Sequence, residues 1–359
     1  MRKFLAFGIC FLLICSILIP ISLGYDIKTV KQQPVSYNLG NTFYVGGSGE
    51  GNYTKIQDAI DNASDGDTVF VYKGTYNERI KINKSVNLNG EDRENTFING
   101  SPKLVTIIID ANNIDLTGFT IQTPGLSQLW RRGIIVYNDS KNIKIYNNII
   151  SKNYFGIELN DIEGKVDVRI YDNIIIENKY GIDGDGDRDS IVEIYNNNFV
   201  NNEVGISVYT NYSVHNNLVS ENSIGIRVRI GLTSLIYNNH IEKNKIGIRV
   251  LLCGGTQIYE NNFIDNDIQA CLLKYAYIVF DVKFFEAIKF LRLSKQKWHN
   301  NYWDNWNSEI PKPIFGLSSI FFVIWIIFPF RPCPVPIPFP YPYFEFDWHP
   351  TQKPYDIEV

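Results

Sequence analysis

Two carboxylic acids, Glu158 and Asp183, stand at the same position in two successive copies of a repeated sequence pattern. If the copies stack as neighbouring coils, the two backbones lie roughly 4.8 Å apart. Retaining glycosidases hold two carboxyl groups about 5 to 5.5 Å apart, and repulsion at such spacing raises the pKa of one of them. Arg227, two copies further on, suits a sugar carboxylate. The pattern therefore predicts a candidate catalytic site of Glu158, Asp183 and Arg227, although any two stacked acids would show this spacing.

The residues around these acids suit the binding of a sugar polymer. Two outward series are predicted: Ile135, Glu158, Asp183, Ser207, Arg227 and Arg249, and beside it Tyr137, Asn160, Asp185, Tyr209, Arg229 and Leu251. Aromatic faces pack on sugar rings, and arginine pairs with uronate carboxylates. A projecting loop at 124–132 adds one tryptophan. The candidate binding residues are Tyr137, Tyr209, Arg227, Arg229, Arg249 and Trp130; the alternative is a solvated face without a ligand.

A short acidic segment, 183–189, reads Asp-Gly-Asp-Gly-Asp-Arg-Asp. Alternating aspartates and glycines can wrap an oxygen-seeking cation such as calcium. The segment is not an EF-hand, because no glutamate follows at the twelfth position. A candidate calcium site and a solvated turn both remain open, and the ligands of such a site would be Asp183, Asp185, Asp187 and Asp189.

The elements that position these residues come from a repeat between Ile145 and Ala270. Apolar residues alternate there in short runs, which predicts strands, and no window shows helical spacing. Three short strands fit a copy of about 22 residues. The sequence therefore predicts an all-β fold, a right-handed single-stranded parallel β-helix or solenoid. The copies begin at Ile145, Ile170, Ile194, Val214, Ile236 and Ile258.

Three positions of the repeat are nearly invariant. Two of these positions hold asparagine and one holds glycine, and the residues at one position in successive copies are called a column here. We expect both asparagine columns to adopt left-handed backbone angles at corners and their amides to bond to one another as a ladder. We expect the glycines to let the chain turn tightly. These columns are predicted to be scaffold. The first asparagine column is Asn148, Asn173, Asn197, Asn217, Asn239 and Asn261; the second is Asn153, Asn178, Asn202, Asn222, Asn244 and Asn266; the glycine column is Gly156, Gly181, Gly205, Gly225 and Gly247.

The N-terminal part precedes the repeat. Residues 1–24 have a basic start, an apolar run at 4–21 and small residues at the end, as in a cleaved signal peptide; an uncleaved anchor is the alternative. Residues 25–41 are polar and irregular. The β-helix domain is predicted to cover 42–312. A helix at 54–63 should cover its open end, with Thr54 and Gln57 forming a capping box.

The C-terminal part, 313–359, is hydrophobic and rich in proline. No charged residue occurs in 314–330, which is at the short limit for a membrane helix but also rich in β-branched and aromatic residues. We expect either an aromatic cap on the C-terminal open end or a membrane-associated segment. Residues 331–343, with proline at nearly every second position, should form extended polyproline-like chain.

The sequence YTKIQDAIDNASDGDTVFVYKGTYNERIKINKSVNLNGED, with Gly74, Tyr76 and Glu78, resembles the opening of pectin-lyase-like β-helix proteins. It is most similar to the secreted group that includes the NosD family and the carbohydrate-binding and sugar-hydrolysis repeat domains. This resemblance implies the fold over roughly 42–310 and says little about function. Copper binding is implied by the NosD name alone, because Met1 is the single methionine and the four histidines are scattered.

Composition narrows the class of function. A net charge of −4 over 359 residues gives no bulk attraction to nucleic acid. No cysteine spacing predicts a disulfide framework. We expect an exported, extracellular or cell-surface protein that binds carbohydrate or an envelope polymer without catalysis, with possible membrane association through 4–21 or 314–330. The alternatives are a lyase or hydrolase of an anionic polysaccharide, and a structural surface-layer or adhesion protein.

Overall fold

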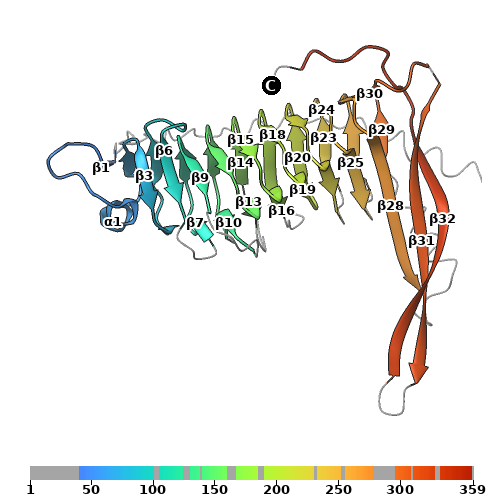
Figure 1. Cartoon of the computed structure of the whole chain (residues 1–359), viewed down its shortest axis with the longest axis horizontal. Coiled ribbons are helices and arrows are strands. Elements are labelled where there is room, and N and C mark those ends of the chain that lie inside the picture. The colour runs from blue at the N-terminus through green and yellow to red at the C-terminus, as the bar shows by residue number, and fades with distance from the viewer. Residues whose placement is uncertain are drawn as a thin grey trace, which may run out of the picture. The chain divides into compact units, whose positions relative to one another are not determined.

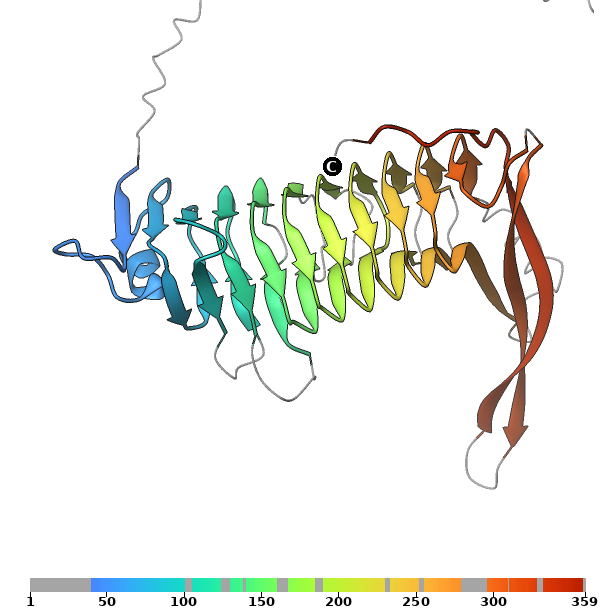
Figure 2. The ribbon, with the colours of Figure 1, turned by 45° about the horizontal axis from the view of Figure 1, so that its top comes forward.

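The computed structural model describes residues 40–357 except 101–104, 124–129, 138–139, 160–166, 185–189, 230–232, 252–254, 279–295, 309 and 328–331. The predicted signal peptide and irregular lead-in lie outside these residues, apart from Gly40 and Asn41. The described chain is almost entirely β-structure, with one helix, α1, at Ile56–Asn62. Figures 1 and 2 show its strands stacked as successive coils.

The strands form three columns in which each strand pairs in parallel with its equivalents in neighbouring coils, which confirms the predicted parallel β-helix. The first column is β1(Thr42–Val45), β2(Thr68–Val71), β5(Asn87–Gly90), β8(Ile114–Thr117), β11(Ile143–Tyr146), β14(Asp167–Tyr171), β17(Ile191–Tyr195), β20(Tyr212–His215), β23(Leu235–Tyr237), β26(Gln257–Tyr259) and β29(Lys297–His299).

The second column carries the predicted outward face. It consists of β4(Ile80–Ile82), β7(Val105–Ile109), β10(Arg132–Val136), β13(Phe155–Leu159), β16(Tyr180–Gly184), β19(Val204–Val208), β22(Ile224–Val228), β25(Ile246–Leu251), β28(Ile268–Ile278) and β31(Lys312–Ile327).

The third column forms a separate sheet. It consists of β3(Gly74–Asn77), β6(Thr96–Asn99), β9(Thr120–Gln122), β12(Ile149–Ser151), β15(Ile174–Ile176), β18(Asn198–Val200), β21(Leu218–Ser220), β24(His240–Glu242), β27(Asn262–Ile264) and β30(Tyr302–Trp303).

The core is a continuous stack of aliphatic side chains enclosed by these columns. Ile170, Ile175 and Ile182 are fully buried within one coil, and their equivalents in the neighbouring coils are buried too. Period-two alternation sends every second residue inward, so three short strands supply a complete core layer. The core therefore repeats with the sequence, and the outward residues are free to differ.

The buried asparagines hydrogen-bond from coil to coil. The backbone N–H and side-chain amide of Asn197 both donate to Asn217 Oδ1, each at 3.0 Å. The same amide also donates to the carbonyls of Ile170 and Tyr195. Asn217 is completely buried, so its Oδ1 depends on Asn197 for its donors, and the backbone N–H of Asn197 depends on Asn217 for its acceptor.

The left-handed backbone lies one residue earlier than we predicted. A residue with φ between 51° and 60° directly precedes each asparagine of both columns, and these residues include Asp172, Glu177, Lys152 and Lys243 as well as asparagines. The corner therefore does not depend on the column asparagines. A left-handed residue turns the chain, and the next residue can then direct its amide into the interior.

The glycine column has a different role from the predicted tight turn. Gly156, Gly181, Gly205, Gly225 and Gly247 do not have positive φ. A Cβ atom built on Gly225 would lie 2.6 Å from the carbonyl oxygen of Gly247 and 3.1 Å from Val219. The glycines are required because adjacent coils approach closely here.

At the N-terminal end, α1 buries Ile56, Ala59 and Ile60, the apolar face that the sequence predicts. The predicted capping box is wrong. The helix begins at Ile56 with Lys55 at its N-cap, and no side-chain cap comes from within the helix. The carboxylate of Glu78 instead accepts the N–H groups of Ile56 and Gln57 at 2.9 and 3.0 Å.

At the C-terminal end, aspartates accept the last donors of both asparagine columns. Because each asparagine donates toward the C-terminus, the final member needs an acceptor. Asn301, which extends the first column, donates twice to Asp347 Oδ2, at 3.1 and 3.0 Å. In the second column Asn266 donates to Gln269, whose amide donates to Asp304.

Asp347 is the last residue of a long β-hairpin. Strand β31 pairs antiparallel with β32(Pro332–Asp347), and β31 also pairs in parallel with β28 (Figures 1 and 2). Residues 331–343 were expected as polyproline-like chain, and from 332 they form a paired strand instead. Residues 314–327 are also strand. No helix within the described residues is long and apolar enough to cross a membrane.

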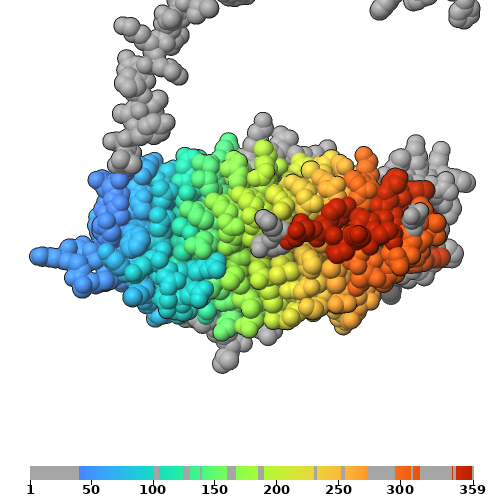
Figure 3. Space-filling model, turned by 90° about the horizontal axis from the view of Figure 1, so that it is seen from above, coloured from blue at the N-terminus to red at the C-terminus, as the bar shows by residue number. Residues whose placement is uncertain are grey.

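The chain after β32 turns back along the coils, where Figure 3 shows it lying on the surface. Thr351 pairs with Tyr302. The backbone of Tyr355 exchanges two hydrogen bonds of 2.8 Å with the side-chain amide of Asn262. The tail therefore covers part of the third sheet.

We predict that Gly225→Ala lowers the free energy of unfolding by about 1–3 kcal/mol, because the added methyl group meets a backbone carbonyl. Ser223→Ala, at an exposed position of the same coil, is the control and should be neutral. Urea unfolding of both variants measures the difference. Equal stability of the two variants would show that the coils are not in close contact here.

We also predict that Asn239→Ala costs at least about 2 kcal/mol, because it removes the acceptor of the buried Asn217 N–H and amide and the donor to the Val214 carbonyl. Asn238→Gly is the matched control: Asn238 has φ of 51°, a conformation that glycine adopts readily. Thermal and urea unfolding compare the two. An Asn239→Ala protein as stable as Asn238→Gly would refute the role given to the buried amides.

Candidate functional site

The charged column is the name used here for the outward residues Glu158, Asp183, Ser207, Arg227 and Arg249. Backbone pairing places each beside the next, in the predicted order. Ile135 precedes the column and Cys271 follows it. Strands β13 to β25 position these residues, because their neighbours in sequence are the buried aliphatic residues of the core.

Arginines engage both acids of the charged column. Arg132, one coil before Glu158, donates to its carboxylate through Nε and Nη2. Arg229 Nη2 lies 2.7 Å from Asp183 Oδ1, and Arg227 Nη2 lies 3.7 Å from the same oxygen. The side chains of Asp183 and Arg227 are 16% and 17% exposed. Such partly desolvated pairs are stronger than exposed ones, but burial offsets much of the gain.

The arginine partners of Glu158 and those of Asp183 lie toward opposite ends of the solenoid. The partner of Glu158 lies on the preceding coil, whereas the partners of Asp183 lie two coils further on. Ser207, between them, accepts hydrogen bonds from Arg227 Nε and Nη2 at 3.2 and 3.0 Å. The arrangement forms a fixed network of charges, and a substrate would have to compete with these arginines for the acids.

Burial raises the pKa of Asp183 above its ordinary value of 3.8. The charges of Arg229 and Arg227 and a hydrogen bond from Ser207 act in the opposite direction and only partly offset it. Desolvation penalises the ionised carboxylate, which is the usual way in which proteins create an acid that holds its proton. Burial therefore favours the protonated form of Asp183.

An aromatic patch, defined here as Trp130, Tyr154, Phe155 and Tyr180, borders the charged column. Trp130 is 54% exposed and stacks on Tyr154 at 5.6 Å between ring centroids. Phe155 stacks on Tyr180 at 5.2 Å. Arg227 lies 5.0 Å from the ring of Tyr180, so the patch and the charged column are in contact.

Sequence reasoning found Trp130 but missed Arg132, Tyr154, Phe155 and Tyr180 as site residues. Phe155 and Tyr180 occupy the position just before the glycine column, where later copies carry Val204, Ile224 and Ile246. An aromatic residue in two copies and an aliphatic one in the others is a signal that comparison of the copies could have detected.

The remaining predicted binding residues are distributed around this region. Tyr209 lies under Arg229, whose guanidinium carbon is 4.1 Å from the ring centroid. Tyr137 is 39% exposed. Arg249 has no carboxylate partner among the residues described by the structure, and it lies beside Cys271, whose thiol pKa is raised by burial.

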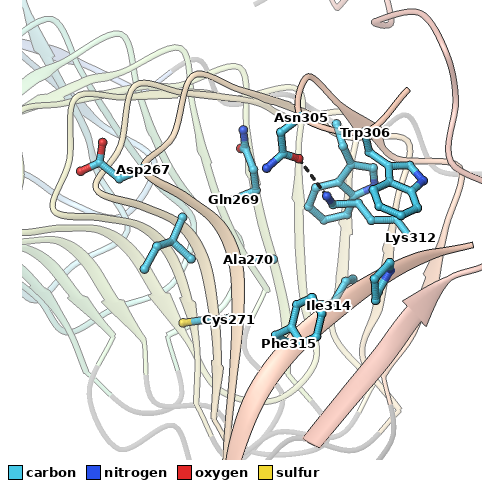
Figure 4. A pocket seen from close by; sticks show the side chains of 12 residues that line it. Asp267, Gln269, Ala270, Cys271, Asn305, Trp306, Lys312, Ile314 and Phe315 are labelled. Atoms are coloured by element: carbon cyan, nitrogen blue, oxygen red, sulfur yellow. Dashed lines mark hydrogen bonds between the residues drawn. The ribbon is translucent and has the colours of Figure 1, made fainter. Parts of the chain in front are cut away.

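A cavity of about 510 Å³ lies where the charged column reaches the last coil. Cys271, Trp306, Lys312 and Phe315 are among its lining residues (Figure 4). Lys312 Nζ donates to Asn305 Oδ1 at 2.8 Å and lies 5.1 Å from the ring of Trp306. Burial lowers the pKa of Lys312. Lys312 thus places an amino group beside an indole ring, and Asp267 adds a carboxyl group to the lining of the cavity.

The candidate calcium ligands are only partly visible. Asp183 is bound by arginines, and Asp185, Asp187 and Asp189 lie outside the described residues. No group of three or more potential metal-ligating residues occurs in the part of the chain that the structure describes. Calcium binding at 183–189 therefore stays a prediction.

The described fold defines a parallel β-helix repeat protein. The chain belongs to the NosD family, described as periplasmic copper-binding protein, whose sequence pattern matches residues 60–307. A 72-residue stretch, 19% of this chain, is 43% identical to the cell surface glycoprotein of Methanothermus fervidus. That stretch covers only 12% of the relative's length.

Three solved structures are similar to this chain at low identity. Pectin methylesterase from Aspergillus niger is 12% identical, with 70% of this chain and 95% of that chain covered and a TM-score of 0.37. Alginate lyase from Paenibacillus sp. is 13% identical over 65% and 93% of the chains, with a TM-score of 0.33. Mannuronan C-5 epimerase from Azotobacter vinelandii is 17% identical over 61% and 74%, at 0.35. Likenesses this weak carry no argument about function.

The described residues do not fit a copper site. His215 and His299 lie in an outer stack of rings, where His215 is 5.2 Å from Tyr195 and 4.8 Å from Tyr237. His240 pairs with Glu242 on its own strand. Copper prefers several imidazole, thiolate or thioether donors around one point, and within the described chain these histidines are not gathered in that way.

We predict that the raised pKa of Asp183 makes its contribution to the free energy of unfolding fall as pH rises. The folded protein holds this proton more tightly than the unfolded chain, so the loss begins near 3.8 and ends above the raised pKa. Urea unfolding across this pH range, with Asp183→Asn as the non-titrating reference, measures the effect. If the stability of the native protein relative to the variant instead rises with pH, the arginines have a larger effect on the pKa of Asp183 than burial has.

Proposed function

We propose that this protein is an exported β-helix protein of the cell surface that binds an anionic polysaccharide along the second column of strands. The observation that supports this best is the contact between the aromatic patch and an arginine-rich column, made by Arg227 and Tyr180. Exposed aromatic faces fit sugar rings, and guanidinium groups fit uronate carboxylates. The surface location draws on the names of the family and of the glycoprotein relative.

The charge balance along the column indicates where the polymer would be held. Glu158 balances Arg132, whereas Asp183 is shared by Arg227 and Arg229. With Arg249, the later coils carry three arginines against one acid. An anionic polymer would therefore bind with its sugar faces on Trp130 and its carboxylates toward Arg249 and the cavity around Lys312.

The test is direct binding of polygalacturonate and alginate, with neutral dextran as the comparison polymer. We predict that Trp130→Ala and Arg249→Ala each weaken polyuronate binding by roughly tenfold, or about 1.4 kcal/mol. Trp348→Ala removes another exposed tryptophan, 61% exposed and on the hairpin side, and should bind normally. Binding should weaken with salt, because it involves ion pairs.

Two results would refute the proposal. Absence of saturable binding to any polyuronate, with or without calcium, would favour a purely structural or adhesive surface protein. Equal affinity of the Trp130→Ala, Arg249→Ala and native proteins would place the polymer elsewhere on the molecule.

A second candidate is a polysaccharide lyase or hydrolase, and the raised pKa of Asp183 favours it. Glu158 and Asp183 would act as the acid and its partner, with Arg227 holding the sugar carboxylate. Incubation of the native protein with each polyuronate, followed by measurement of new chain ends, tests it. Cleavage abolished by Asp183→Asn would support the enzyme; intact polymer with normal binding would support the binding protein.

A further inference from the structure

The sequence contains the pattern Asn-x-Ser/Thr, called a sequon here, at six places. This pattern is the acceptor for N-linked oligosaccharides in exported proteins. The pattern alone does not identify a modified residue, because the folded chain must also leave the asparagine amide in solvent. The six asparagines are Asn52, Asn62, Asn83, Asn99, Asn138 and Asn211. Asn138 lies outside the described residues, and the structure separates the other five.

Three of these asparagines are half-buried and bonded within the fold. The side-chain amides of Asn52 and Asn99 donate to neighbouring oxygens at 2.6 and 3.3 Å. Asn211 accepts a hydrogen bond from Thr233, and the residue after it, Tyr212, is buried in the core. A glycan at any of these positions would compete with contacts of the folded chain.

Asn62 is exposed, but its sequon is held in the fold. Asn62 is the last residue of α1, and its side-chain amide donates to the carbonyl of Asp58 at 2.8 Å. The next residue, Ala63, is 3% exposed and belongs to the core. The middle of this sequon is therefore inside the protein.

Asn83 differs from the other four. It is exposed, and it lies in the turn between β4 and β5. Its side chain makes no hydrogen bond or ion pair with any residue of the described chain. The amide therefore faces solvent, and the fold does not use it.

The neighbours of Asn83 hold the turn in place. Lys84 Nζ donates to three carbonyls at the C-terminal end of α1, at 2.7 to 3.2 Å, as lysines near helix ends commonly do. The backbone of Ser85 accepts a hydrogen bond from Gly66 and donates one to Asp65. The turn is thus fixed by residues other than Asn83, which it presents to solvent.

We propose that Asn83 carries an N-linked oligosaccharide. The donor is an oligosaccharide linked to a lipid phosphate, and a membrane-bound transferase catalyses the reaction. A bond forms between Asn83 Nδ2 and the anomeric carbon of the sugar, and the bond from that carbon to the phosphate oxygen breaks. The lipid phosphate leaves, and the amide releases one proton. Ser85 supplies the hydroxyl group of the acceptor pattern.

The glycan and the charged column occupy different coils. Strand β4 pairs with β7, β7 with β10, and β10 with β13, which carries Glu158. Three coils at roughly 4.8 Å each correspond to about 14 Å along the axis. The glycan therefore adds a bulky, soluble layer beside α1, on the side of the charged column away from Arg249.

This inference rests on the export proposed above, because the transfer takes place outside the cytosol. It does not depend on polysaccharide binding.

The experiment is glycopeptide mass spectrometry of the full chain isolated from the envelope of the cells that produce it. Cleavage after glutamate releases the peptide 79–91, which contains the Asn83 sequon and no other. We predict that this peptide carries an added mass of whole sugar units. The peptide 51–78, which contains the sequons of Asn52 and Asn62, should be unmodified.

Three variants assign the added mass to the sequon. Asn83→Gln removes the acceptor amide, and Ser85→Ala keeps the amide but breaks the acceptor pattern, so both should lose the added mass. Ser85→Thr restores the pattern and should keep it. Asn62→Gln, at the other exposed acceptor, is the matched control and should leave 79–91 modified. Asn83→Gln should fold normally, because the Asn83 side chain makes no bond in the described chain.

An unmodified 79–91 peptide from envelope-derived protein would overturn this inference and leave the proposed polysaccharide binding untouched. Added mass on 51–78 instead of 79–91 would overturn the choice of Asn83, as would added mass retained by Asn83→Gln or Ser85→Ala. Unmodified protein recovered only from the cytosol would refute the proposed export, and this inference with it.

Discussion

Each coil of this protein depends on its neighbours for the hydrogen bonds of its buried asparagines. The bonds run in one direction, from each amide to the oxygen of the next, as from Asn217 to Asn239. A directional chain of donors must end on an acceptor, and a carboxylate is an acceptor without a competing donor. Asp347 and Asp304 occupy those ends. The C-terminal hairpin is therefore part of the scaffold, because it delivers Asp347.

The same constraint separates structure from function along the sequence. Residues that repeat in every coil are needed for stacking, as the glycine and asparagine columns show. The copies differ in the charged column and at Phe155 and Tyr180, and the function proposed above uses this region. Both acids of the charged column are engaged by arginines, and this pairing is the basis on which we propose a binding surface.

Much of the fold could be predicted from the sequence, because the repeat fixes both the period and the inward positions. The register of the charged column followed directly from that repeat. The structural roles predicted for the asparagine and glycine columns were less accurate. The corner lies one residue before each buried asparagine, and the glycines avoid a clash between coils. Neither role was predicted, because both depend on contacts between copies that a single copy does not contain.

The ends were harder to predict for the same reason. Glu78 caps α1 from a distant strand, so a local capping motif could not reveal it. The proline-rich segment has the composition of an isolated extended chain, yet it pairs because alternate prolines leave one edge intact. At the site, Arg132 could not be assigned to Glu158 without the fold, since 26 residues separate them.

We have proposed that the outward residues in which the coils differ form the binding surface. A crystal structure of the protein soaked with an oligogalacturonide tests this most directly. We predict sugar density on Trp130 and beside Arg249, with carboxylates toward arginine side chains. Density on the third sheet, or none at saturating oligosaccharide, would contradict the account.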